Sequence, residues 1–216
     1  MKNQMIEQTN MFVRSQLGED ATGHDWFHVD RVRRTALHIC TQEQNGDPFI
    51  IEMAALLHDI PDEKLNDSAE AGKNKLNLFL NSIALPEEAQ NAIVEIIDSI
   101  SYKGGSKTEL KTVEAKIVQD ADRLDAIGAI GIARTFAYGA KKGQPIYDPS
   151  IHVREEMSLE EYRKGKSTSI HHFYEKLLKL KDLMNTDTAK EMAESRHQTM
   201  VDFLEQFYLE WDGQDR

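Results

Sequence analysis

The sequence has a single cysteine, few glycines and prolines, and no long apolar run. Because Cys40 has no second cysteine to pair with, an internal disulfide is excluded and a reducing compartment, the cytoplasm, is expected. Twelve glycines and five prolines in 216 residues are too few for a turn-dense β-sandwich or barrel. The longest uncharged run of small and apolar residues, Ala126 to Ala133, is eight residues long, against the ~18–20 of a membrane-spanning helix. Residues 1–5 also lack the apolar stretch of a signal peptide. These absences predict a soluble cytoplasmic protein.

Basic residues are outnumbered, since 26 Lys and Arg against 37 Asp and Glu give a formal net charge of −11. Such a charge repels nucleic acid and anionic membranes, so neither is an expected partner. A locally basic segment from Arg134 to Lys181 holds ten basic and six acidic residues, an excess of +4 that leaves −15 for the rest. This segment suits a small anion such as phosphate, or it forms a solvated lysine face.

Apolar residues recur at helical spacing, as at Ile93, Ile96, Ile97 and Ile100, and the strict alternation of strands is nearly absent. Breaks are expected at Gly18, at residues 45–48 and at Pro86. The pattern predicts helices over residues 3–17, 25–44, 48–58, 68–81, 86–101, 112–137, 158–163, 169–183 and 187–211. Residues 101–106 and 139–169 carry turn chemistry or weak periodicity. The expected fold is an all-α bundle, with residues 1–216 forming a single domain.

Two segments contain histidines that are candidate metal ligands. His24 and His28 lie four residues apart on a predicted helix, so they share a face and can bind one metal, although such histidines are more often structural or exposed. The doublet His58-Asp59 ends an apolar helix. Burying its carboxylate without a partner is costly, and a cation removes that cost; the alternative is a solvated turn at the helix end.

A third segment places Asp120, Asp122 and Asp125 inside an otherwise apolar helix. Asp122 and Asp125 lie three residues apart and share a face, whereas Asp120 points elsewhere. The alternative roles are helix capping and a surface ion-pair network. Histidines and carboxylates from three segments would make a mixed nitrogen and oxygen site, which suits Mn, Fe, Ni, Mg or Co.

The order His28, His58-Asp59, Asp122 resembles the H…HD…D signature of the HD-domain superfamily of metal-dependent phosphohydrolases. The segments His-Asp-Trp-x-His-x-x-Arg-Val, Leu-Leu-His-Asp-Ile and Asp-Ala-Asp-Arg-Leu-Asp-Ala-Ile-Gly are similar to those of its small bacterial single-domain group, over residues 20–210. The resemblance implies an HD-type helical bundle in which His28, His58, Asp59 and Asp122 hold one divalent metal ion, with Mn favoured. Motif order is the only reason to prefer Asp122 over Asp120.

The resemblance also implies an activity. Members similar to this chain release pyrophosphate from nucleoside or deoxynucleoside triphosphates, so the expected substrate is a small phosphorylated metabolite, a nucleotide above all. The alternatives are a phosphomonoesterase and a non-catalytic, metal-containing module that senses nucleotides. A second His-x-x-x-x-His-His pair is missing from the sequence, which disfavours a two-metal phosphodiesterase.

Residues near the signature have candidate supporting roles. Asp62 and Glu63 follow the doublet and are candidates for the general base or for orienting water. The candidates for contacts with substrate phosphates are His24, Lys64, Lys103, Arg123, His171 and Lys176. The aromatic residues Phe203, Phe207, Tyr208 and Trp211 of the last helix are expected in the core, with a homodimer interface as the alternative.

Overall fold

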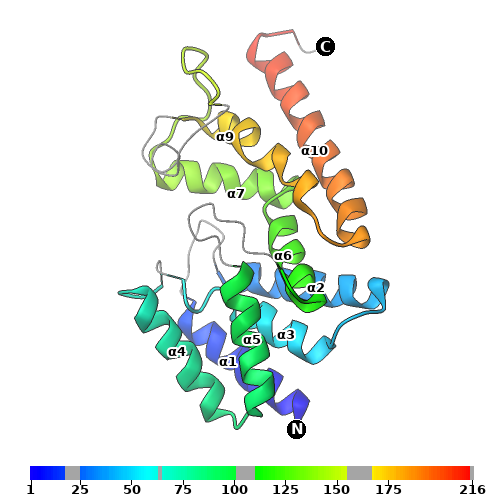
Figure 1. The fold of residues 1–216 in the computed structure, drawn as a ribbon. Coiled ribbons are helices and arrows are strands. Elements are labelled where there is room, and N and C mark those ends of the chain that lie inside the picture. Colours follow the sequence, from blue (N-terminus) through cyan, green and yellow to red (C-terminus); the bar gives the residue numbers. More distant parts are fainter. Residues whose placement is uncertain (18–24, 63–64, 101–109, 155–166, 215–216) are drawn as a thin grey trace. The chain divides into compact units, whose positions relative to one another are not determined.

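The computed structural model describes residues 1–17, 25–62, 65–100, 110–154 and 167–214. Within these ranges the chain is helical and has no strand, which confirms the predicted all-α class (Figure 1). The chain forms two compact units, Met1–Ala121 and Asp122–Arg216. The prediction of one domain over residues 1–216 stays a prediction.

None of the helices in the described ranges has the length and apolar character that crossing a membrane requires.

The first unit is built around α3 (Pro48–Leu57), a helix whose residues are all apolar except Glu52. Its buried side chains are Phe49, Ile51, Met53, Ala54, Ala55, Leu56 and Leu57. A helix of this kind has to be enclosed by others, and α3 contacts α1 (Lys2–Gln16), α2 (Trp26–Glu43) and α5 (Glu87–Ile100). The unit also contains α4 (Ala69–Ser82) and the first part of α6 (Val113–Asp125).

A short turn joins α2 to α3 and confirms the break predicted at residues 45–48. Gln44 adopts the left-handed conformation at the end of α2, and Gly46 has a φ of +93°. The Asp47 side chain then accepts a hydrogen bond from the Phe49 N–H at 2.8 Å, and Pro48 occupies the first helical position. Because the connection is short, α2 and α3 are antiparallel neighbours, and the start of α2 lies beside the end of α3.

Helix α4 approaches the turn after α3 very closely at Gly72. A Cβ atom at this position would lie 2.6 Å from the Pro61 carbonyl oxygen, so only glycine permits the approach. The Asn66 side-chain amide donates to the carbonyl oxygens of Ile60 and Asp62, each at 2.8 Å. These contacts fix the backbone that follows His58-Asp59.

The second unit contains α7 (Gly128–Lys141), α9 (Ser169–Glu175), the 3₁₀ turns η1 (Leu177–Lys179) and η2 (Lys181–Leu183), and α10 (Asp187–Trp211). Rings from three helices meet in its core, with the Phe203 centroid 5.8 Å from both Phe136 and Phe173. Phe203 packs against these rings but is itself only half-buried, and Trp211 is 49% exposed, so these two aromatic residues are not enclosed in the core as predicted. The homodimer alternative stays a prediction.

The single helix predicted over residues 112–137 is wrong, because the chain forms two helices there. Helix α6 ends at Asp125 and α7 begins at Gly128, with Ile127 extended between them. Gly128 has a φ of +74°, a conformation that favours glycine, and its position leaves no room for a side chain beside Arg196. Both helices bury one face, so apolar residues recur at helical spacing on either side of the break. The periodicity of the sequence therefore gives no sign that the helix is interrupted.

The helix predicted over residues 169–183 is also wrong, since α9 ends at Glu175. Lys176 leaves the helical region with φ −138° and ψ −57°, and the chain continues as η1 and η2. Leu177 and Leu180, which belong to or flank these turns, are buried. The apolar residues that predicted a continuous α-helix can therefore be buried by 3₁₀ turns as well. The helix predicted over residues 158–163 lies outside the described residues.

Replacing Gly128 by alanine is expected to lower the free energy of unfolding by about 1–3 kcal/mol. The added Cβ would be strained at φ +74° and would lie 2.9 Å from the Cβ and Cγ atoms of Arg196. Urea unfolding at an unchanged slope measures the loss. Gly143→Ala is the matched control, because Gly143 also has a positive φ, +64°, but nothing within 4 Å. Equal losses in both variants would show that the contact with Arg196 is unimportant.

Candidate metal centre

His28 lies in the first turn of α2, where Asp25 caps the helix. The Asp25 side chain accepts a hydrogen bond from the His28 backbone N–H at 3.0 Å. Trp26, the first helical residue, lies under the Arg14 guanidinium, 4.3 Å from the ring centroid to Cζ. These two contacts fix where α2 begins and hold His28, which is 2% exposed, in the interior.

His58 and Asp59 lie where α3 ends and the chain turns. The backbone N–H of Ile60 donates to Leu57 at 3.0 Å, and that of Asp62 donates to Asp59 at 3.0 Å. His58 is buried, whereas the Asp59 side chain is 20% exposed. The doublet thus places a buried imidazole next to a carboxylate that solvent reaches.

The packing of α2 on α3 brings His28, His58 and Asp59 together. His28 Nε2 lies 3.5 Å from Asp59 Oδ2, and His58 Nε2 lies 3.3 Å from Asp59 Oδ1. The two imidazole centroids are 5.4 Å apart, with 65° between the ring planes. One ligand atom from each residue lies within 4.8 Å of the other two. Three of the four predicted metal ligands therefore form a cluster.

The donor set of this cluster fits a divalent cation. His58 Nδ1 lies 2.8 Å from the Ala55 carbonyl oxygen, which can only accept, so Nδ1 carries the proton and Nε2 presents its lone pair toward Asp59. A histidine held in this way by a backbone carbonyl is the usual form of a metal ligand. Two nitrogens and one carboxylate oxygen suit a borderline or hard cation such as Mn or Fe.

The two candidates for a fourth ligand differ in their surroundings. Asp120 and Asp122 are two residues apart on α6, so their side chains point about 200° apart around the helix axis. Asp120 is fully buried in the first unit and does not belong to the cluster of His28, His58 and Asp59. Asp122 is the first residue of the second unit and is partly exposed. Its place in the ligand set stays a prediction.

Asp125, the third acid of α6, forms a buried ion pair. The carboxylate is 4% exposed and lies 2.6 Å from Arg134 Nη1 of α7. Arg196 of α10 donates a hydrogen bond to the Leu124 carbonyl oxygen beside it. Burial lowers the pKa of Arg196, and the negative charge of Asp125 opposes that shift. Asp125 thus helps to hold the junction of α6 and α7.

Of the two predicted catalytic residues, Asp62 and Glu63, the structure describes Asp62. The Asp62 backbone is fixed by the turn, because its carbonyl oxygen accepts hydrogen bonds from Leu65 N–H and the Asn66 amide. Its side chain is partly exposed. Glu63 and three of the predicted phosphate contacts, His24, Lys64 and Lys103, lie outside the described residues.

The other predicted phosphate contacts lie in the second unit. Arg123 donates a hydrogen bond to the Leu183 carbonyl oxygen. His171 is 3% exposed and lies edge-on to Tyr147, with ring centroids 5.5 Å apart, and burial lowers its pKa. Lys176 is exposed and lies beyond the end of α9, so it does not share a helical face with His171, which lies within α9. Their roles toward phosphate stay predictions.

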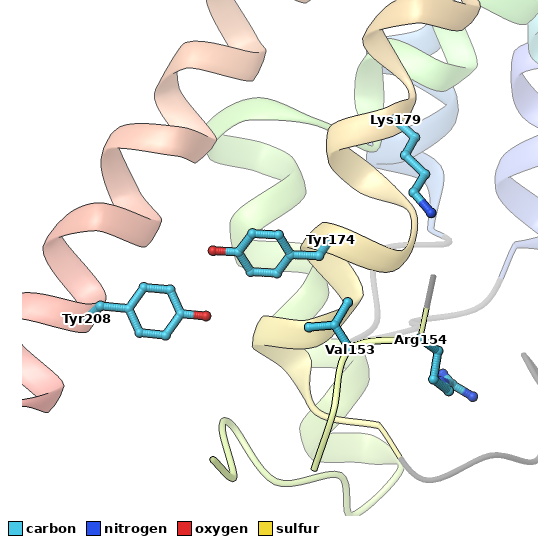
Figure 2. A pocket seen from close by; sticks show the side chains of 5 residues that line it. All are labelled: Val153, Arg154, Tyr174, Lys179 and Tyr208. Atoms are coloured by element: carbon cyan, nitrogen blue, oxygen red, sulfur yellow. The ribbon is translucent and has the colours of Figure 1, made fainter. Parts of the chain in front are cut away.

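The second unit also contains an open cleft of about 610 Å³, lined by Val153, Arg154, Tyr174, Lys179 and Tyr208. Figure 2 shows the hydroxyl groups of Tyr174 and Tyr208 pointing toward one another. Burial and the hydrogen bond with Tyr174 raise the pKa of Tyr208. Sequence reasoning missed this cleft, because its residues come from three separate segments and share no motif.

Beside the cleft, Arg154 forms a two-point ion pair with Glu175 of α9. Arg154 Nε lies 2.8 Å from Glu175 Oε1, and Arg154 Nη2 lies 2.7 Å from Oε2. Ser167 adds a hydrogen bond to Oε2 at 3.0 Å. Burial raises the pKa of Glu175, but these hydrogen bonds and the charge of Arg154 outweigh it, so the pKa lies below the usual value. The carboxylate is therefore charged inside the fold.

Comparison with known proteins shows the family. The HD domain matches residues 26–127, a range that contains His28, His58, Asp59 and Asp122. The uncharacterized protein YpgQ of Bacillus subtilis is 39% identical over 211 residues, which cover 97% of this chain and 95% of YpgQ. The chain belongs to the HD-domain family, and membership supports a hydrolase as the general class of activity.

Solved structures agree with this assignment over nearly the whole chain. An HD-superfamily hydrolase of Bacillus thuringiensis is 49% identical with a TM-score of 0.79, covering 98% of this chain and 99% of that one. A protein of Lactobacillus plantarum gives 40% identity and a TM-score of 0.83, with 97% and 98% covered. YpgQ in complex with ADP gives 36% identity and a TM-score of 0.77, with 97% and 100% covered.

The ion pair of Glu175 makes stability depend on pH. Because the pKa of Glu175 is lower in the folded chain than in the unfolded one, its contribution is present above the unfolded-state value of about 4.3 and is lost as the pH falls through the folded-state value. Glu175→Gln is expected to lower the free energy of unfolding by about 2–3 kcal/mol at pH 7, and by less at pH 3. Urea unfolding at several pH values measures both.

Glu194→Gln is the control, because Glu194 forms an exposed ion pair with Lys181 at 3.0 Å. Its loss is expected to stay below about 0.5 kcal/mol at every pH. A cost of Glu175→Gln that stays constant between pH 7 and pH 3 would contradict the role of its charge.

Proposed function

We propose that the chain is a metal-dependent phosphohydrolase that cleaves nucleoside or deoxynucleoside triphosphates to the monophosphate and pyrophosphate. The observation that carries the proposal is the cluster of His28, His58 and Asp59, whose ligand atoms converge within 4.8 Å at the junction of α2 and α3. It supports hydrolysis because two histidines and a carboxylate leave room for further ligands, as catalytic metal sites require.

Four residues hold the cation in this proposal. His28, His58 and Asp59 supply three ligand atoms, and Asp122 supplies the fourth, as the order of the family motif indicates. Mn²⁺ is the favoured ion, since it accepts a mixed nitrogen and oxygen donor set. When bound, a divalent cation acts as a Lewis acid toward the phosphoryl group and lowers the pKa of water.

The protein contributes orientation and charge. The Ala55 carbonyl keeps the lone pair of His58 Nε2 directed at the cluster. Asp62 and Glu63 follow directly in the chain and are assigned to orient water or to accept its proton. The substrate phosphates are assigned to the side chains of His24, Lys64, Lys103, Arg123, His171 and Lys176.

A nucleotide is proposed as the substrate because a close relative binds one. YpgQ was solved in complex with ADP, and it matches this chain over 97% of its length. ADP has a nucleoside and a diphosphate, the two parts that a nucleotide pyrophosphohydrolase has to recognise. The ADP bound to YpgQ supports a nucleotide as the chemical class of the substrate, and the reaction products identify which phosphate bond is cleaved.

Purified wild type loaded with Mn²⁺ is expected to release pyrophosphate and monophosphate from triphosphates. His58→Ala is expected to lower metal affinity and turnover by about 100-fold, because it removes one of the ligands. Metal analysis and product chromatography measure the two effects. His38→Ala, an exposed histidine of the same helix as His28, is the matched control and is expected to change neither.

The products separate this proposal from its alternatives. Orthophosphate without pyrophosphate would identify a phosphomonoesterase instead. Nucleotide binding without turnover in a metal-loaded sample would identify a sensing module. Equal metal binding by wild type and His58→Ala would contradict the metal centre itself.

A further inference from the structure

One ion pair joins α2 to α3 close to the metal centre. Arg33 Nη1 of α2 donates to Glu52 Oε1 of α3 at 2.8 Å. The Arg33 side chain is only 25% exposed and that of Glu52 only 14%. A charged hydrogen bond in such a setting is short and directional, unlike the apolar contacts around it.

Arg33 is itself held rigid before it reaches α3. Its Nε and Nη2 atoms donate to Asp30 Oδ1 at 3.1 and 2.8 Å, within the same helix. Burial lowers the pKa of Arg33, but the hydrogen bonds with Asp30 and Glu52 outweigh that effect and raise it. The guanidinium therefore stays charged, with one edge fixed on α2 and the remaining nitrogen directed at Glu52.

Arg33 and Glu52 lie at similar distances from the metal centre along their two helices. Arg33 follows His28 by five residues, about 7.5 Å along α2, and Glu52 precedes His58 by six residues, about 9 Å along α3. Because the helices are antiparallel neighbours, the contact between Arg33 and Glu52 and the contact between His28 and the His58-Asp59 doublet form two successive crosslinks.

The two crosslinks also lie on opposite borders of the buried face of α2. At 3.6 residues per turn, Arg33 lies about 140° around the axis from His28, with the buried Val29, Val32 and Ala36 between them. Apolar packing is non-directional and permits small rotations and shifts of one helix on the other. A directional contact at the far border opposes both movements.

We propose that Arg33 and Glu52 are positioning residues for the metal centre: their ion pair sets the rotation and register of α2 on α3, and thereby the separation of His28 from His58 and Asp59. The inference rests on the proposed function. Compared with an apolar pair of similar size, an ion pair with this little exposure adds little net stability, although removing one partner alone is costly. Metal ligation, in contrast, tolerates errors of only about 0.2 Å in ligand positions. The pair is therefore worth more to metal affinity than to folding.

The test is Mn²⁺ binding to the full chain, measured by calorimetry on metal-free protein. Arg33→Met is expected to weaken binding by about tenfold, the lower end of the effect of losing an outer positioning contact. Arg34→Met is the matched control, because Arg34 pairs with the same Asp30 but is 65% exposed, and this ion pair stays within α2. It is expected to change binding by less than about twofold.

Two further variants separate positioning from stability. The double variant R33M/E52M leaves no buried carboxylate unpaired, so its melting temperature is expected to recover relative to Arg33→Met while Mn²⁺ binding stays weak. Arg33→Lys, which keeps a charge within reach of Glu52, is expected to restore part of the affinity.

Wild-type binding by Arg33→Met, or an affinity that follows the melting temperature across the variants, would overturn the inference and leave the proposed function standing. A wild type that binds no Mn²⁺ would overturn the proposed function, and the inference with it.

Discussion

The antiparallel packing of α2 against α3 is the constraint on which the candidate site depends. The turn capped by Asp47 reverses the chain, so the first turn of α2 meets the end of α3. Helix α3 is apolar except for Glu52 and has to be enclosed, which fixes it among α1, α2 and α5. His28 and His58 lie close together because this packing fixes the positions of the backbone segments that carry them.

The polar groups at this junction have polar contacts within the fold. The Ala55 carbonyl accepts from His58, the Asp25 side chain caps the turn that carries His28, and Asp59 faces both imidazoles. A cluster of this kind in an apolar environment is costly unless its charge is compensated. A divalent cation held by these three residues would provide that compensation and would link the stability of the junction to the metal chemistry proposed for the chain.

The second unit solves a similar problem with different interactions. Aromatic rings from α7, α9 and α10 form its core, and two ion pairs of low exposure, between Asp125 and Arg134 and between Arg154 and Glu175, fix chain junctions. The first of these pairs explains why Asp125, one of the three acids of α6, is buried, and it needs no metal to do so. The acid cluster of that helix therefore combines structural and candidate ligand roles.

The sequence by itself determined the helical class and the break before Pro48, because apolar periodicity and turn residues are local properties. Its resemblance to the HD-domain family indicated four metal ligands, and three of these lie together in the structure. The sequence failed at Gly128 and at Lys176, where a close approach of Arg196 and the burial of Leu177 and Leu180 override the periodicity. Only the tertiary structure decided that Asp125 pairs with Arg134, that Arg33 reaches Glu52 and that Arg154 holds Glu175. Such contacts depend on how helices pack, and packing joins residues whose separation along the chain carries no signal.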